Sequence, residues 1–243
     1  MIKLIDDVNA LGFMKSGAFS AKIQGFALTY GTEYDFALFY AQYVGDTPVS
    51  ALSKVDGNIV LYSTDDTDFE ELREFLGAVG FSTVQGDYSA LKQLELNISD
   101  SSYIVKSEKR LNAEKPKNFN ENPDMKKIHS LLTESGFEMG DYPAFASDVC
   151  ARLNKGTARV GVIGERDCCV FRLFEGKDCV LLGAVATDKS KRGQGIASAL
   201  VTYMAQGEKD AYLLTRNDSL LNFYEKLGFT PVGRWGTGGI SAD

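Results

Sequence analysis

The feature that most constrains the fold of this chain is an internal repeat. Two stretches each begin with a helix-period segment that opens on Ala-Phe and continue through three strand-like runs joined by polar Gly or Asp turns. The first stretch reads AFSAKIQGFALTYG, DFALFYAQYVGD, PVSALSKVDG and NIVLYSTDD. The second reads AFASDVCARLNKG, ARVGVIGERD, CCVFRLFEGKD and CVLLGAVATDK. This order predicts a duplicated unit, with chance likeness of two α+β segments as the alternative.

A polar segment separates the two copies. Val105 to Lys127 reads VKSEKRLNAEKPKNFNENPDMKK, which is charged, rich in asparagine and interrupted by two prolines. Such a segment buries little apolar surface and is typical of a connection between domains. We therefore predict an α+β protein with a mixed sheet, divided into a first domain over residues 1–104, a linker over 105–126 and a second domain over 127–243.

Composition limits the classes of partner and cofactor. The net charge of −7 argues against general binding of nucleic acid or anionic membranes, and it leans mildly towards a cationic partner. Four cysteines without a CxxC pair and a single histidine, His129, predict buried thiols and no metal site. We expect His129 to be a surface or capping residue. No apolar run suits a signal peptide or a membrane span, so we expect a cytoplasmic protein.

A basic glycine loop in the second copy predicts an anion site. The strand that ends at Asp188 leads into KSKRGQGIASAL, which brings three positive charges to the turn before a helix. Gly193 and Gly195 remove side chains where backbone must approach a ligand, and the first N–H groups of the helix have no partner within it. Glycine turns also precede helices that bind nothing. In the first copy the corresponding STDDTDFEEL is acidic, which satisfies its own helix and repels phosphate.

Two linked motifs in this region resemble one enzyme family. The run from Arg192 to Ala197 matches the R/Q-x-x-G-x-G/A signature of the GNAT acyl-CoA N-acyltransferase superfamily. Downstream, YLLTRNDSLLNFYEKLGFTPVGRW is similar to the family's next segment, and Asn217 stands seven residues before Tyr224, as the family's spacing requires. The resemblance covers roughly residues 125–243. Over residues 1–103 it is architectural only, and it implies two GNAT-like halves with a degenerate first copy.

The resemblance implies which residues bind the coenzyme. Two parallel strands, Cys179–Thr187 and Ala211–Thr215, would splay apart to hold the pantetheine arm of acetyl-CoA, used as co-substrate without a metal. Tyr224 would be the general acid that protonates the leaving thiolate, with a plain aromatic core residue as the alternative. The coenzyme-binding residues would be Val185, Ala186, Thr187, Arg192, Gly193, Gln194, Gly195, Ile196, Ala197, Ser198 and Asn217.

The function that follows from the resemblance is N-acetyl transfer to a primary amine by direct attack in a ternary complex. The alternatives are a non-catalytic acyl-CoA-binding or regulatory module, and an aminoacyl transferase of the tandem-GNAT kind. The sequence leaves the acceptor, the length of the acyl group, the oligomeric state and the general base open. Candidates for the base are Glu165, Asp188 or an acid of the first half, and deprotonation through water needs no dedicated residue. After Trp235 the chain reads GTGGISAD, which predicts a truncated last strand and a substrate pocket to which the first half contributes a part.

Overall fold

The computed structural model describes residues 1–107, 113–120 and 122–239. The middle of the predicted linker and the last four residues of the chain lie outside the described residues. The first half contains β1 (Ile2–Leu4), the 3-10 helix η1 (Val8–Phe13), α1 (Ala18–Tyr30), β2 (Ala37–Val44), β3 (Thr47–Val55), β4 (Asn58–Ser63), α2 (Phe69–Val79), β5 (Thr83–Asp87), α3 (Tyr88–Gln93) and β6 (Asn97–Ser107). The second half contains β7 (Phe119–Asn120), α4 (Met125–Glu134), α5 (Tyr142–Asn154), β8 (Arg159–Ile163), β9 (Cys168–Glu175), β10 (Cys179–Thr187), the 3-10 helix η2 (Lys189–Lys191), α6 (Ile196–Ala205), β11 (Asp210–Leu214), the 3-10 helix η3 (Asp218–Leu220), α7 (Leu221–Glu225) and β12 (Phe229–Gly239).

The repeat is visible in the order of the strands within the sheet. The described strands form one sheet in the order β1-β2-β3-β4-β5-β12-β6-β11-β10-β9-β8-β7. Counted from the two ends of the sheet, the strands of the halves correspond in order: β1 to β7, β2 to β8, β3 to β9, β4 to β10 and β5 to β11, with β12 and β6 at the centre. The strand order is therefore symmetric about the β12–β6 pair, and the predicted α+β fold with a mixed sheet and two similar halves is confirmed.

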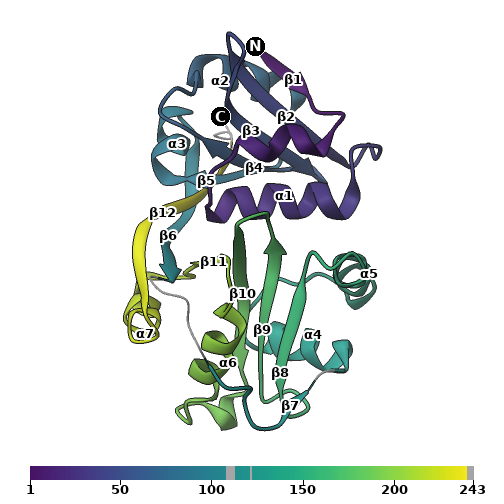
Figure 1. Ribbon diagram of the computed structural model, residues 1–243, viewed down its shortest axis with the longest axis vertical. Helices are drawn as coiled ribbons and strands as arrows, with labels where there is room; N and C mark the ends of the chain where they lie inside the picture. The colour runs from purple at the N-terminus through teal and green to yellow at the C-terminus, as the bar shows by residue number, and fades with distance from the viewer. Residues whose placement is uncertain (108–112, 121, 240–243) are drawn as a thin grey trace.

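The two halves exchange their last strands at the centre of the sheet. β6 comes from the first half, yet it pairs with β11 of the second half and with β12. β12 in turn lies between β6 and β5 of the first half. Figure 1 shows β12 and β6 running together from the lower half of the molecule to the upper half. Each half thus depends on a strand of the other to complete its sheet.

Both faces of the sheet in the second half are covered, because neighbouring residues of a strand point to opposite faces. On β9, Cys168 and Val170 pack with α6 on one face. Cys169 and Phe171 pack with α4 and α5 on the other. This double burial explains why CCVF is apolar without alternation. Cys168, Cys169 and Cys179 are buried free thiols, as predicted, whereas Cys150 is exposed.

Helix α1 lies between the two halves and contacts strands of both. It packs on β9 and β10 of the second half as well as on β3 and β4 of its own, and Figure 1 shows it lying across the upper ends of β9 and β10. The approach is close at Gly25, where a Cβ atom would meet Phe174 Cδ1 at 2.8 Å. A larger residue at this position would push α1 away from the second half.

The predicted truncation of the last strand is wrong. β12 runs over 11 residues, from Phe229 to Gly239. The glycines near its end are typical of a loop in the sequence, but β5 and β6 flank the strand on its two sides. The packing there is close, because a Cβ atom at Gly238 would lie 3.0 Å from the carbonyl oxygen of Asn97. At the other boundary, β6 continues to Ser107, so regular structure extends into the segment predicted as a linker.

We expect Trp235→Ala to lower the free energy of unfolding by about 3–5 kcal/mol, because it deletes a large buried ring from the exchanged strand. The Trp235 side chain is only 7% exposed, and its Nε1 donates a hydrogen bond of 3.0 Å to the carbonyl oxygen of Thr215. Urea unfolding followed by circular dichroism measures the change. Val232→Ala, on an exposed part of the same strand, is the matched control. A loss below about 1 kcal/mol for Trp235→Ala would contradict this role.

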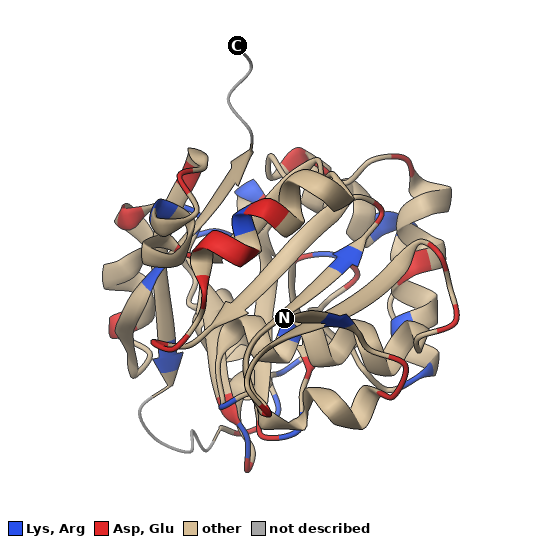
Figure 2. Ribbon diagram, turned by 90° about the horizontal axis from the view of Figure 1, so that it is seen from above, with Lys and Arg blue, Asp and Glu red and all other residues tan. Residues whose placement is uncertain are grey.

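Figure 2 shows Lys and Arg residues interspersed with Asp and Glu residues across the ribbon. Within the described residues, no helix is both long and apolar enough to span a bilayer. No group of three or more His, Cys, Asp or Glu side chains in the described part of the chain is arranged to hold a metal ion.

Candidate active site

The candidate site begins where β10 and β11 separate. The two strands pair in parallel register from Cys179 and Asp210 to Leu182 and Leu213. Beyond that point β10 continues to Thr187 without pairing to β11, whose other edge remains bonded to β6. The backbone of the last part of β10 therefore faces an opening in the sheet, as the two-strand splay predicted.

A bulge in β10 turns the strand at this point. Gly183 is opposite Phe171, and Ala186 is opposite Cys169, so β10 has one residue more than β9 between the two pairs. Ala184 lies in the bulge with a φ of 49°, a backbone conformation that is costly for a residue with a side chain. Bulges of this kind redirect strands beside functional sites.

The opening leads into a cavity of about 810 Å³. Every residue that the sequence predicts for the site lines it, both the coenzyme-binding set and Tyr224. The described residues of its wall all lie between residues 135 and 224, in the second half of the chain. Its lining residues are Ser135, Phe137, Val185, Ala186, Thr187, Lys191, Arg192, Gly193, Gln194, Gly195, Ile196, Ala197, Ser198, Arg216, Asn217, Leu220, Phe223 and Tyr224.

One end of the cavity is the start of α6. Gly195 precedes the helix in the left-handed conformation with a φ of 75°, and no side chain caps the helix there. A Cβ atom at Gly193 or Gly195 would meet no atom within 4 Å, so both glycines border open space. The first N–H groups of α6 have no partner within the helix, and none of the described residues of its first turn is acidic. Together with the positive end of the helix dipole, these groups can bind an anion.

Two cations stand at this end of the cavity. The Arg192 guanidinium donates a hydrogen bond of 3.2 Å from Nε to the carbonyl oxygen of Thr187, which holds the side chain beside the end of β10. Lys191 Nζ lies 3.6 Å from Asp167 Oδ2 and is still substantially exposed. The remaining N–H groups of Arg192 are available to a ligand in the cavity.

The corresponding region of the first half is built differently. α2 begins at an N-cap, Asp68, whose carboxylate accepts hydrogen bonds from the N–H groups of Glu70 and Glu71. The cavity at the end of β4 and β5 measures only about 250 Å³ and is lined by Asp65 and Asp87 among others. Burial raises the pKa of Asp87 to about 6. In the first half the Asp68 carboxylate thus occupies the helix start that is free in the second half, and two further carboxylates line the cavity beside it. This end of the first half is therefore unsuited to a phosphate.

Tyr224 is both a core residue and a wall of the cavity. Its ring packs against Phe223 and Phe229, with centroids 5.1 Å and 6.1 Å away, and the residue is 4% exposed. Burial raises the pKa of Tyr224 to about 12. The phenol is therefore protonated at neutral pH and can give a proton to a leaving group in the cavity, but it cannot act as a base there.

Six residues of the wall are not among the predicted site residues: Ser135, Phe137, Lys191, Arg216, Leu220 and Phe223. Arg216 follows β11 and donates hydrogen bonds to the carbonyl oxygens of Ser135 (3.2 Å) and Gly136 (2.8 Å), and its guanidinium lies 4.5 Å from the centroid of the Phe137 ring. It thereby fixes the connection between α4 and α5 over the cavity. The partners are about 80 residues apart in the chain, and no local pattern announces such a contact.

The candidate bases lie outside this wall. Glu165 is exposed and pairs with Lys127 at 2.5 Å, which lowers the pKa of Glu165. Asp188 accepts hydrogen bonds from Ser190, which lower its pKa, and lies 3.5 Å from Arg166.

His129 Nε2 lies 3.1 Å from the carbonyl oxygen of Gly140, so the imidazole links α4 to the segment before α5.

Comparisons with known proteins agree with this geometry. Residues 151–231 match the family model of the acetyltransferase (GNAT) domain. No curated protein sequence matches the chain. Among solved structures, similar folds include a GCN5-related N-acetyltransferase from Kribbella flavida, with 13% identity, a TM-score of 0.61 and coverage of 95% of this chain and 98% of that one.

Two further structures cover the two-halved arrangement. A tandem GNAT protein from the clavulanic acid biosynthesis pathway has 13% identity, a TM-score of 0.57 and full coverage of both chains. A Drosophila protein has 12% identity, a TM-score of 0.66 and coverage of 98% of each chain. Residues 151–231 of this chain therefore match the GNAT domain, and the fold of the whole chain is similar to that of solved GNAT proteins, one of them a tandem GNAT protein.

Proposed function

We propose that this protein is an N-acetyltransferase that moves an acetyl group from acetyl-CoA to a primary amine. The observation that carries the proposal is the divergence of β10 from β11 after Leu182. It opens a cavity onto which the free start of α6, Asn217 and the protonated phenol of Tyr224 all face. A GNAT domain is an acyltransferase domain, and the acetyl donor and the amine acceptor are the specific part of the proposal.

The coenzyme would bind along the open edge of β10. The backbone of Val185, Ala186 and Thr187 would pair with the pantetheine amides as an added strand does. The pyrophosphate would accept hydrogen bonds from the N–H groups of residues 193–198, with Arg192 and Lys191 adding positive charge and Asn217 contacting the coenzyme from the other side of the gap.

The reaction would be a direct attack in a ternary complex. The amine nitrogen forms a bond to the thioester carbon, and a backbone N–H at the β10 edge stabilises the charge on the thioester oxygen. When the C–S bond breaks, the hydroxyl proton of Tyr224 passes to the sulfur. The proton released by the amine goes to water. Tyr224 then regains its proton from solvent.

We also propose that the first half is a degenerate partner that does not bind the coenzyme, with residues 1–104 as its domain and residues 127–243 as the catalytic domain. The capped start of α2 and the small acidic cavity beside it support this division of roles. The first half still contributes β6, whose Tyr103 carbonyl oxygen accepts a hydrogen bond from the Thr215 N–H directly after β11 and whose N–H donates to the Thr215 hydroxyl.

A mass-spectrometric screen tests the function. The protein is incubated with acetyl-CoA and a panel of small amines, polyamines and lysine-containing peptides, and we expect at least one amine to gain an acetyl group with release of free coenzyme A. The Tyr224→Phe variant is the control for uncatalysed transfer. Tight binding of acetyl-CoA without acetylation of any amine would instead support a non-catalytic acyl-CoA-binding module.

A further inference from the structure

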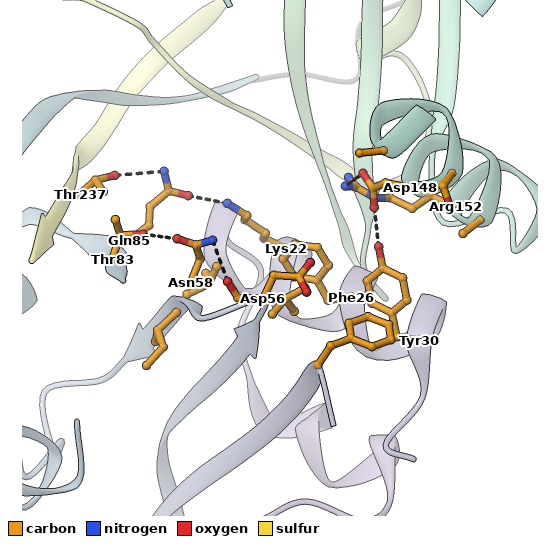
Figure 3. Close-up of a pocket in the computed structure, with 17 residues that line it drawn as sticks. Lys22, Phe26, Tyr30, Asp56, Asn58, Thr83, Gln85, Asp148, Arg152 and Thr237 are labelled. Atoms are coloured by element: carbon orange, nitrogen blue, oxygen red, sulfur yellow. Dashed lines mark hydrogen bonds and ion pairs between the residues drawn. The ribbon is translucent and has the colours of Figure 1, made fainter. Parts of the chain in front are cut away.

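A second cavity, of about 700 Å³, lies between the two halves (Figure 3). It is enclosed by α1, by the starts of β4 and β5 in the first half, and by α5 of the second half. None of the described residues that line it also lines the Tyr224 cavity. Its volume is within the usual range for sites that bind small molecules.

One face of α1 forms the floor of this cavity. Lys22, Phe26 and Tyr30 follow at intervals of four residues and therefore share a face of the helix. The rings of Phe26 and Tyr30 are stacked with centroids 6.0 Å apart, and Phe36 packs edge-on against Tyr30 at 5.3 Å. The middle of the cavity is thus an aromatic surface suited to the apolar body of a ligand.

At the α5 end of the cavity the charges neutralise one another. The Arg152 guanidinium is paired with the Asp148 carboxylate, which also accepts a hydrogen bond from the Tyr30 hydroxyl. Arg152 in addition lies 5.5 Å from the centroid of the Phe26 ring. Figure 3 shows this group across the cavity from Lys22. The Asp148 carboxylate is therefore already paired with Arg152 and Tyr30, and it does not neutralise the charge of Lys22.

At the other end Lys22 has no anionic partner. Its Nζ donates a hydrogen bond of 2.7 Å to Gln85 Oε1, and Gln85 is held in this orientation because its Nε2 donates to Thr237 Oγ1 at 3.4 Å. Among the residues that the structure describes, no carboxylate lies within salt-bridge distance of Lys22. An ammonium group has three donors, so two of them are left for a ligand.

The electrostatic surroundings of Lys22 favour an added negative charge. Burial and the positive charge of Arg152 lower the pKa of Lys22 to about 8. The other ionisable groups of the lining are Asp148 and Tyr30, which bond to each other, and Asp56, which is exposed at the turn between β3 and β4. An anion beside Lys22 would compensate the charge that the protein itself leaves unpaired.

We propose that this cavity is a second ligand site, which binds a small monocarboxylate with an aromatic or aliphatic body. The carboxylate accepts hydrogen bonds from the Lys22 ammonium, and the body packs on Phe26, Tyr30 and Phe36. The ligand contacts both halves of the chain, since α1 belongs to the first half and α5 to the second. The site is distinct from the coenzyme cavity and independent of the function proposed for it.

Phenylacetate is the probe, and isothermal titration calorimetry at pH 7 measures its binding to the full chain. We expect saturable binding of one equivalent. Phenylacetamide, which has the same shape without the charge, should bind at least about tenfold more weakly, because a charge-assisted hydrogen bond contributes about 1.5–3 kcal/mol. Lys22→Gln should weaken phenylacetate to the same extent. Lys15→Gln, which removes an exposed lysine just before α1, is the matched control and should leave the affinity unchanged.

Two further measurements keep the test independent of any folding defect in Lys22→Gln. Affinity in the unmodified protein should fall about tenfold between pH 7 and pH 9, because Lys22 loses its proton as the pH rises through a pKa of about 8. Ser147→Trp, on the exposed face of α5, should block the cavity without disturbing the core. The proposal is overturned if phenylacetate does not bind, if phenylacetamide binds equally well, or if acetyl-CoA displaces phenylacetate competitively, which would place the probe in the Tyr224 cavity.

Discussion

Replacing Tyr224 with phenylalanine should lower kcat by about 100-fold or more, the smallest effect typical of a general acid, and leave the affinity for acetyl-CoA nearly unchanged. The substitution removes only the hydroxyl group. The ring would keep its contacts with Phe223 and Phe229, so the wall of the cavity and the end of β10 would keep their shape. The lower kcat should therefore arise from slower departure of the thiolate, which no longer receives a proton from residue 224.

The raised pKa of Tyr224 also sets the pH dependence expected of this step. Because burial raises the pKa of Tyr224 to about 12, the phenol stays protonated throughout the neutral and mildly alkaline range. The rate should consequently show no decline attributable to Tyr224 below about pH 11. Tyr203→Phe removes a hydroxyl group on α6 outside the cavity and serves as the control. Full turnover by Tyr224→Phe with an identified acceptor would remove Tyr224 from the mechanism.

The double substitution Arg192→Glu with Gly195→Asp should weaken acetyl-CoA binding at least 100-fold, a change of about 2.7 kcal/mol. It replaces a cation beside β10 with an anion and places a second carboxylate at the start of α6, where the N–H groups are free. Both new charges would repel the pyrophosphate, and like charges brought together at an interface cost several kcal/mol. The side chain at position 195 would also project into the cavity, where Gly195 now leaves space.

Calorimetric titration with coenzyme A measures this effect. Lys189→Glu reverses a charge in the neighbouring turn outside the cavity lining, so it should change the affinity far less than the double substitution. Gly195 adopts a φ of 75°, a conformation that aspartate tolerates better than most residues, so we expect the double variant to fold. A melting experiment on each variant separates loss of binding from loss of folding. Unchanged affinity in a folded double variant would refute the assignment of the start of α6 as the pyrophosphate site.

Much of the candidate site could be predicted because it depends on short-range patterns. The glycine turn before α6, the basic residues beside it, and the seven-residue spacing from Asn217 to Tyr224 all lie within one strand–loop–helix unit or the next. With the exception of Lys189, the structure places these residues on one cavity. The bulge at Ala184 was not predicted, because nothing in the local sequence marks an alanine for a left-handed conformation.

Other features depended on contacts between distant segments. Arg216 meets the carbonyl oxygens of Ser135 and Gly136 only after α4 has packed against the sheet. The cavity around Lys22 exists because α1 and the starts of β4 and β5 in the first half meet α5 of the second half there. In the sequence Lys22 is the one charged residue of α1, and its lack of a carboxylate partner is a property of the assembled molecule.

The sequence by itself determined the local elements of this protein: the repeated helix and strands, the capped start of α2 and the uncapped start of α6. These follow from side-chain periodicity and from backbone preferences that act over a few neighbouring residues. Only the tertiary structure decided that β6 and β12 change places and that β12 is a full strand. Strand pairing joins residues far apart in the chain, and the glycines of β12 form a strand because β5 and β6 enclose them on both sides.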